Sequence, residues 1–214
     1  MRTALALLGV AVLGFAWFGP WPARVPNSFF SHMAIHISVV AVAAPLIAAG
    51  TARLVPVHMP GLFLAPVPAS LFEFVVIWGW HFPALHDLAR ASTGGFIAEQ
   101  ASFLASGLLL WVSALHRTHA VEDSRGAGVA ALLLTSMHMI LLGTLLVLAR
   151  RPLYGHGSAA GAEAMLAEQQ AGGILMLIGG GLPYLAGGLW LVWQLLQPPQ
   201  PVEVAAPRSA VGTR

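Results

Sequence analysis

The chain has 214 residues, of which 57% are hydrophobic and 8% are charged. An average soluble domain has roughly 25% charged residues, so lipid must cover much of this protein's surface. The net charge is only +2, every basic side chain is arginine, and there is no cysteine. The chain therefore has no basic stripe for nucleic acid, and disulfides and thiolate metal sites are excluded. Nine histidines accompany only eight acidic residues, so we expect histidine to carry the chemistry.

Six apolar stretches are long enough to cross a membrane, which takes ~20 residues for ~30 Å of hydrocarbon. They cover residues 3–19, 28–50, 66–86, 95–115, 128–149 and 171–196. The predicted fold is an all-α, polytopic membrane bundle of about six transmembrane helices, with residues 1–196 as one domain. Residues 197–214 are rich in proline, alanine and valine without periodicity, so we expect a disordered tail there.

The first stretch has two interpretations. Arg2 followed by the apolar run to Phe18 is similar to the start of a signal peptide. The run ends in Gly19-Pro20-Trp21-Pro22, however, and no clear small-residue cleavage site follows. We therefore expect an uncleaved helix.

The arginines give a weak orientation signal. With six spans, the side of both termini holds Arg2, Arg53, Arg117, Arg125, Arg208 and Arg214. The other side holds Arg24, Arg90, Arg150 and Arg151. Because positive residues favour the cytoplasm, we expect both termini there.

Most polar side chains of the apolar stretches fall in the half of the membrane away from the termini. They are His32, His36, His81, His86, Glu99, Gln100, His156, Glu168, Gln169 and Gln170. This convergence depends on the number of spans and holds for either orientation. We therefore expect one polar site near the outer face.

His32 and His36 are four residues apart, so a helix places both imidazoles on one face, roughly 6 Å apart. Such a pair either binds a metal ion or makes structural hydrogen bonds. Within an apolar span a polar pair is costly, which favours a functional role.

His81 precedes Pro83, whose missing N–H frees a carbonyl in the preceding turn. His81 either bonds such a carbonyl or belongs to the site. His86 stands beside Asp87, and we expect it to be solvated. The remaining histidines lie in the segments that connect the predicted spans, and we expect them to be ordinary loop residues. They are His58, His116, His119 and His156.

Two polar residues lie deeper in the apolar stretches. His138 is mid-span between Met137 and Met139 and needs a partner at that depth. Glu73 lies about two turns beyond His81 and is a candidate proton carrier, ligand or histidine partner.

Imidazole suits copper, zinc, iron and nickel, and an added thioether favours cuprous copper. Met33 is adjacent to the histidine pair in sequence, although its side chain points elsewhere on the helix. With no cysteine, copper is favoured over zinc.

Other functions remain open from the residues alone. Three histidines could hold zinc while Glu73 or Glu168 activates water, as in a hydrolase of lipid amides. Histidines from two facing spans could hold haem for electron transfer. A copper permease is disfavoured because the polar groups are confined to one half of the membrane.

Short motifs follow one another along residues 32–174. They are His32-Met33-x-x-His36 with Pro45-Leu46, Trp80-His81-x-Pro83 with Asp87, Glu99 with Trp111, Pro152-Leu153-Tyr154, and Gln169-Gln170-x-Gly172-Gly173-Ile174. In this order the set resembles the CtaG-type family of cytochrome c oxidase assembly factors. That family consists of multi-pass membrane proteins linked to the maturation of haem–copper oxidases.

The resemblance implies an assembly factor rather than an enzyme, located in a bacterial cytoplasmic (inner) membrane and supplying copper to the oxidase's catalytic subunit. We expect His32, His36 and His81 as copper ligands, with His138 and Met33 as second candidates. The expected supporting residues are Glu73, Trp80, Asp87, Glu99, Gln100, Glu168 and Gln169. The expected partners are membrane lipid, cytochrome c oxidase subunits and a periplasmic or other extracytoplasmic copper donor.

The chain departs from the family pattern at three positions. Gln100 stands where the family often has a histidine, Glu168 replaces an aspartate, and Leu177 replaces a tryptophan. If the family histidine is a ligand, this chain has an altered ligand set, and His138 is the candidate replacement.

Overall fold

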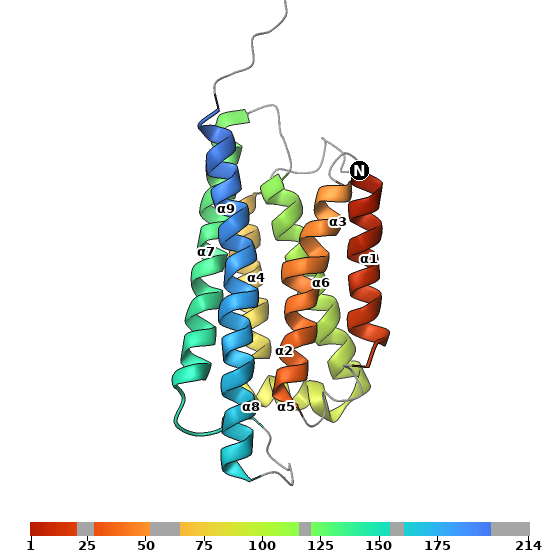
Figure 1. Cartoon of the computed structure of the whole chain (residues 1–214), viewed down its shortest axis with the longest axis vertical. Coiled ribbons are helices and arrows are strands. Elements are labelled where there is room, and N and C mark those ends of the chain that lie inside the picture. Colours follow the sequence, from red (N-terminus) through yellow and green to blue (C-terminus); the bar gives the residue numbers. More distant parts are fainter. Residues whose placement is uncertain (21–27, 52–64, 116–120, 155–160, 198–214) are drawn as a thin grey trace, which may run out of the picture.

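The computed structural model describes residues 1–20, 28–51, 65–115, 121–154 and 161–197, and all regular structure in these ranges is helical (Figure 1). The elements are α1 (Arg2–Phe18), α2 (Phe29–Ile37), the π-helix η2 (Ser38–Ala43), α3 (Ala44–Thr51), α4 (Pro66–Trp80), α5 (Pro83–Ala91), α6 (Thr93–Leu115), α7 (Val121–Leu148), α8 (Ala162–Leu175), the π-helix η3 (Met176–Gly180) and α9 (Gly181–Leu195). The predicted all-α bundle is confirmed.

Four continuous helical segments are long and apolar enough to cross a membrane. They are Phe29–Thr51, Thr93–Leu115, Arg125–Leu148 and Ala162–Leu195. The shorter apolar helices α1 and α4 account for the other two predicted spans. The protein is therefore a multi-pass membrane protein.

The third span is shorter than the predicted 66–86, because α4 ends at Trp80. Pro83 has no N–H to continue the helix, and the N–H of Phe82 instead bonds to the Gly79 carbonyl at 3.0 Å. Phe82 is extended, and α5 begins at Pro83 in a new direction. The sixth span begins at Ala162 rather than 171, since α8, η3 and α9 form one continuous segment.

Helix α5 lies at one end of the bundle, the end at which α2 and α8 begin (Figure 1). The start of α1 and the ends of α3 and α9 lie at the opposite end. Because α5 packs against α6 and α4, it brings its own side chains to the end of the bundle where α2 begins.

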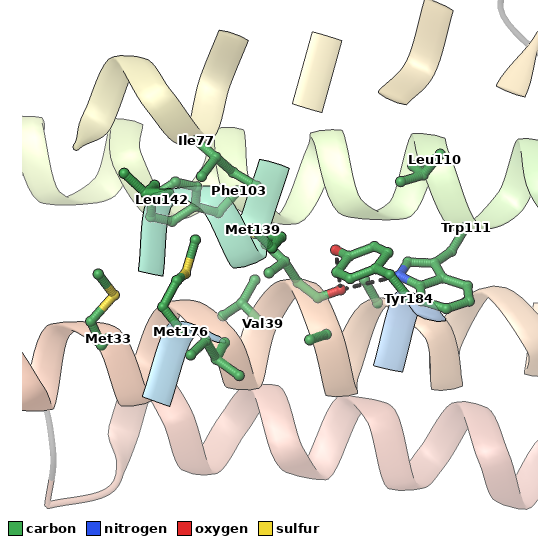
Figure 2. Close-up of a cluster of buried hydrophobic side chains, with 14 of the residues drawn as sticks. Met33, Val39, Ile77, Phe103, Leu110, Trp111, Met139, Leu142, Met176 and Tyr184 are labelled. Carbon is green, nitrogen blue, oxygen red and sulfur yellow. Dashed lines mark hydrogen bonds between the residues drawn. The ribbon is translucent and has the colours of Figure 1, made fainter. Parts of the chain in front are cut away.

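The π-helix η2 leaves a backbone acceptor inside the core. Pro45 stands five residues after Val40, where a π-helical donor would be, and it has no N–H to donate. The Val40 carbonyl accepts instead from Trp111 Nε1 at 3.2 Å and from the Tyr184 hydroxyl at 3.1 Å (Figure 2). One carbonyl thus joins α6 and α9 to η2. Pro45 leaves this carbonyl without a backbone donor, and Trp111 supplies a side-chain donor in its place.

Glycines permit the closest helix approaches. A Cβ on Gly50 of α3 would lie 2.6 Å from the backbone nitrogen of Ala6 in α1, and one on Gly143 of α7 would lie 2.7 Å from that of Leu177. Small residues at such crossings let membrane helices pack backbone to backbone. Helix α1 is therefore packed into the bundle through α3.

Some predictions fall outside the described residues. They concern His58, His116, His119, His156 and the tail from residue 198 onward.

Candidate metal centre

Four histidines meet where α5 closes the end of the bundle. His32 and His36 stack on one face of α2 with ring centroids 6.4 Å apart. His81, at the end of α4, lies 5.7 Å from His32 and 5.3 Å from His36, and His86 of α5 lies 5.0 Å from His32. Each of the four is at most 5% exposed. We call His32, His36, His81 and His86 the histidine cluster.

His81 makes a bond that orients its ring. Its Nδ1 lies 2.7 Å from the Ile77 carbonyl, and because a carbonyl only accepts, Nδ1 must carry the hydrogen. Nε2 is then left with its lone pair. A backbone carbonyl behind a histidine is the usual support for a metal-ligating imidazole, so the structural and the functional interpretations of His81 are compatible.

His86 corrects an expectation. It was predicted to be solvated beside Asp87, but it is buried, because α5 turns its His86 face toward α2. Asp87 Oδ1 lies 3.8 Å from its Nδ1, which is too long for a hydrogen bond. Burial, with smaller contributions from Arg90 and His81, lowers the pKa of His86 to about 3. His86 is therefore a neutral imidazole at physiological pH.

The cluster holds an unusual number of unsatisfied ring nitrogens. Among the described residues no hydrogen-bond partner meets His32 Nε2, His81 Nε2, or either nitrogen of His36 and His86. Leaving a buried polar atom unpaired costs about 1–3 kcal/mol. Six such atoms in one place are donors and acceptors that a bound ligand or water could satisfy.

The spacing fits one ion, but the directions do not yet converge. Imidazoles that share an ion at a metal–nitrogen distance of ~2 Å have ring centres about 5 to 6.5 Å apart, depending on the angle at the metal. The observed 5.0–6.4 Å lies in that range. Within the described part of the chain, however, no three histidine, aspartate or glutamate side chains point at one position so that they could hold an ion as they stand. Binding would require the rings to rotate.

A buried ion pair borders the cluster. Arg90 of α5 donates through Nη2 to Glu99 Oε2 of α6, and its Nη1 lies 3.2 Å from His32 Nδ1. Gln100 Nε2 donates to the same carboxylate oxygen at 3.2 Å, and Gln100 Oε1 accepts from Trp17 Nε1 at 3.1 Å. Gln100 therefore connects Glu99 to α1.

Tyr154 covers the cluster from the α7–α8 side. Its hydroxyl donates to the His81 carbonyl at 2.6 Å, and its ring stacks on Phe29 at 4.3 Å and lies 4.6 Å from His86. Gln169 holds this segment by accepting from the N–H of Leu153 at 2.6 Å.

Glu168 has a different role from Gln169. Its Oε2 accepts from the Ser28 hydroxyl at 2.8 Å and from the Phe30 N–H at 3.2 Å. A carboxylate at a helix N-terminus satisfies free N–H groups and complements the helix dipole. Glu168 therefore fixes the start of α2, one turn before His32.

Three other predicted residues make contacts of their own. Met33 is fully buried in the apolar core, beside Gly172, with Met176 near it (Figure 2). The His138 ring packs against Phe74 at 5.3 Å and lies near enough to His36 for an electrostatic interaction. Among the described residues, its two ring nitrogens have no hydrogen-bond partner either. Trp80 donates to Ser102 at 2.8 Å.

Glu73 forms a second buried polar group, nearer the middle of the bundle. Its Oε1 lies 2.7 Å from the Tyr184 hydroxyl, whose single hydrogen is shared between this oxygen and the Val40 carbonyl at 3.1 Å. Ser70 and Thr135 pair beside it at 2.8 Å. Glu73 is thus a partner of Tyr184 rather than of a histidine.

The sequence profile of the cytochrome c oxidase caa3 assembly factors (Caa3_CtaG) matches residues 1–198. The chain belongs to this family. Comparison with curated proteins and with solved structures gave no significant match. Membership makes the chain a cytochrome c oxidase assembly factor and implies association with that oxidase. In this caa3 assembly factor, the motifs that carried the resemblance lie in or around the histidine cluster and the Val40 carbonyl.

Proposed function

We propose that this assembly factor binds copper at the histidine cluster and releases it to an oxidase subunit. The observation that carries the proposal is the six buried ring nitrogens without partners in the described chain. Neutral imidazoles supply lone pairs that suit copper. The cluster would hold the ion through His32, His36, His81 and His86, with copper as cargo.

Exchangeable ligands support a transfer role. The chain has no cysteine, so a thiolate cage cannot trap the ion. Helix α5 and the start of α2, which carry His86 and His32, lie at the end of the bundle opposite the start of α1 (Figure 1). We place this end at the extracytoplasmic face of a bacterial cytoplasmic membrane, where a periplasmic donor could load it.

The zinc hydrolase alternative has less support. Its two candidate bases are engaged elsewhere, since Glu73 bonds Tyr184 and Glu168 bonds the start of α2. Neither hydrogen bond holds its carboxylate where it could activate a water molecule at the cluster.

Metal content tests the proposal. The full chain, purified from membranes in detergent, is loaded with copper, freed of excess metal and analysed beside His32→Ala/His36→Ala. We expect about one copper per chain in the parent and a large loss in the double variant. Unchanged copper content in the double variant contradicts the proposal, and retained zinc or a haem absorption band would support the alternatives.

His138→Ala is the matched control. It removes a buried histidine whose ring packs on Phe74 and which is not one of the four in the histidine cluster. We expect it to retain copper. In cells that depend on this chain, the double variant should lower the copper content of the assembled oxidase, whereas His138→Ala should not.

A further inference from the structure

Arg90 brings a positive charge to the edge of the histidine cluster. Its side chain is 13% exposed, and it lies between the Glu99 carboxylate and His32. A guanidinium has only hydrogen-bond donors. In its 3.2 Å contact with Arg90, His32 Nδ1 therefore accepts, and neutral His32 must carry its hydrogen on Nε2.

This hydrogen arrangement leaves His32 unable to bind a metal. The lone pair of Nδ1 faces Arg90, and Nε2 is protonated. Coordination by Nε2 requires the hydrogen to be on Nδ1, where Arg90 cannot remain as a donor. The Arg90–His32 hydrogen bond and metal coordination by His32 Nε2 are therefore mutually exclusive.

Glu99 is placed to serve the metal-bound arrangement. Its Oε2 lies 3.7 Å from His32 Nδ1, and a small ring rotation would let it accept an Nδ1–H. Carboxylates commonly support metal-ligating histidines in this way. One carboxylate can thus pair with Arg90 when the cluster is empty of metal and with His32 when it is loaded.

We propose that Arg90 is a positioning residue that promotes metal release, because its guanidinium competes with the metal for His32. The proposal rests on the proposed function and specifies how the same site releases its metal ion. Two further observations separate it from a purely structural ion pair. Among the described residues, Arg90 Nε and Glu99 Oε1 have no hydrogen-bond partner. The ion pair is therefore not bidentate, and each side chain keeps a free donor or acceptor for a second arrangement.

Charge adds to the competition. A guanidinium repels an incoming cation in a site of low dielectric, and the Glu99 carboxylate attracts it. Removing Arg90 alone leaves Glu99 uncompensated and favours the metal. Removing Glu99 alone leaves the guanidinium and disfavours it. Removing both should restore an intermediate affinity.

The test measures Cu(I) affinity and the rate of Cu(I) loss to a coloured chelator, on the full chain in detergent at one pH. We expect Arg90→Gln to slow release at least tenfold, Glu99→Gln to weaken affinity at least tenfold, and Arg90→Gln/Glu99→Gln to fall between them. Arg150→Gln, which removes an exposed arginine at the end of α7, is the matched control and should behave as the parent. Release from Arg90→Gln at the parental rate overturns the proposal.

A second measurement does not depend on the folding of any variant. Nitrogen-15 NMR of histidine-labelled parent protein reports which ring nitrogen of His32 carries hydrogen. We expect Nε2–H without metal and Nδ1–H with Cu(I), and Nδ1–H in both states overturns the proposal. A parent that binds no copper overturns the proposed function itself, whereas copper binding with unaltered release from Arg90→Gln overturns the Arg90 proposal alone.

Discussion

The Nδ1 atom of His81 lies 2.7 Å from the Ile77 carbonyl, so the hydrogen of this ring is fixed on Nδ1 and its Nε2 lone pair is available in the cluster. Helix α4 ends at Trp80, directly before His81, because Pro83 prevents its continuation. The same local break therefore places His81 in the cluster and selects the tautomer that can bind a metal.

Asparagine at position 81 separates these two roles. The asparagine amide nitrogen lies near the position of Nδ1, so His81→Asn keeps the bond to Ile77 but has no counterpart of Nε2. We expect His81→Asn to lose most copper affinity with little change in thermal stability, measured by metal titration and thermal unfolding in detergent. His81→Ala should lose both, with a stability cost of about 1–2 kcal/mol for the missing bond. Parental copper affinity in His81→Asn would remove His81 from the ligand set.

His86→Leu tests a candidate ligand that the sequence did not predict. Leucine fills much of the same buried volume without a lone pair, so we expect at least a tenfold loss of copper affinity. Asp87→Asn is the control at the neighbouring position, and it should leave affinity within a few-fold of the parent. If the two variants bind copper equally well, His86 is a packing residue.

The buried imidazole of His86 also predicts a pH effect on stability. Its pKa is about 3 in the folded protein and about 6.5 when exposed. The unfolded chain therefore binds a proton that the folded chain refuses between these values. The contribution of His86 to stability is complete above pH 6.5 and declines as the pH falls toward 3. Melting temperatures of the metal-free protein should show a shallower decline in His86→Leu than in the parent, and identical pH profiles would contradict this.

Part of this site follows from sequence, and part depends on tertiary contacts. The spacing of His32 and His36 and the order of the spans predict that His81 meets the pair at one end. His86 was missed because the neighbouring Asp87 indicated solvent, while the direction of α5 after Pro83 decides its burial. The contact between Arg90 and Glu99 was also missed, because it depends on how α5 folds back on α6. Likewise, nothing local to Pro45 reveals that Trp111 and Tyr184 supply donors to the Val40 carbonyl.

Trp111 and Tyr184 provide a structural test away from the cluster. Trp111 Nε1 and the Tyr184 hydroxyl both lie within hydrogen-bond distance of the Val40 carbonyl, and Trp111→Phe removes one bond, worth about 1 kcal/mol. Tyr184→Phe also removes the contact with Glu73 and should cost more. The double variant leaves the acceptor unpaired and should lose more than the sum of the two. Thermal unfolding of the parent, the two single variants and the double variant measures this double-mutant cycle. The copper stoichiometry should stay at the parental value in all of them. Strict additivity would show that the two bonds do not compensate for each other.

The absence of cysteine permits a direct test of orientation. Ala162 is exposed at the cluster end of the bundle, and Gln197 is exposed beyond α9 at the other end. We expect a membrane-impermeant maleimide to label Ala162→Cys in intact cells or spheroplasts, and Gln197→Cys only after permeabilisation. The reverse pattern would place the histidine cluster at the cytoplasmic face.

X-ray absorption spectroscopy of the copper-loaded full chain tests copper binding by the histidine cluster most directly. We predict a first shell of nitrogen at ~2 Å with the outer-shell signature of several imidazoles, lost in His32→Ala/His36→Ala and kept in His138→Ala. A sulfur shell from methionine, or a spectrum unchanged by the His32→Ala/His36→Ala substitutions, would contradict the account.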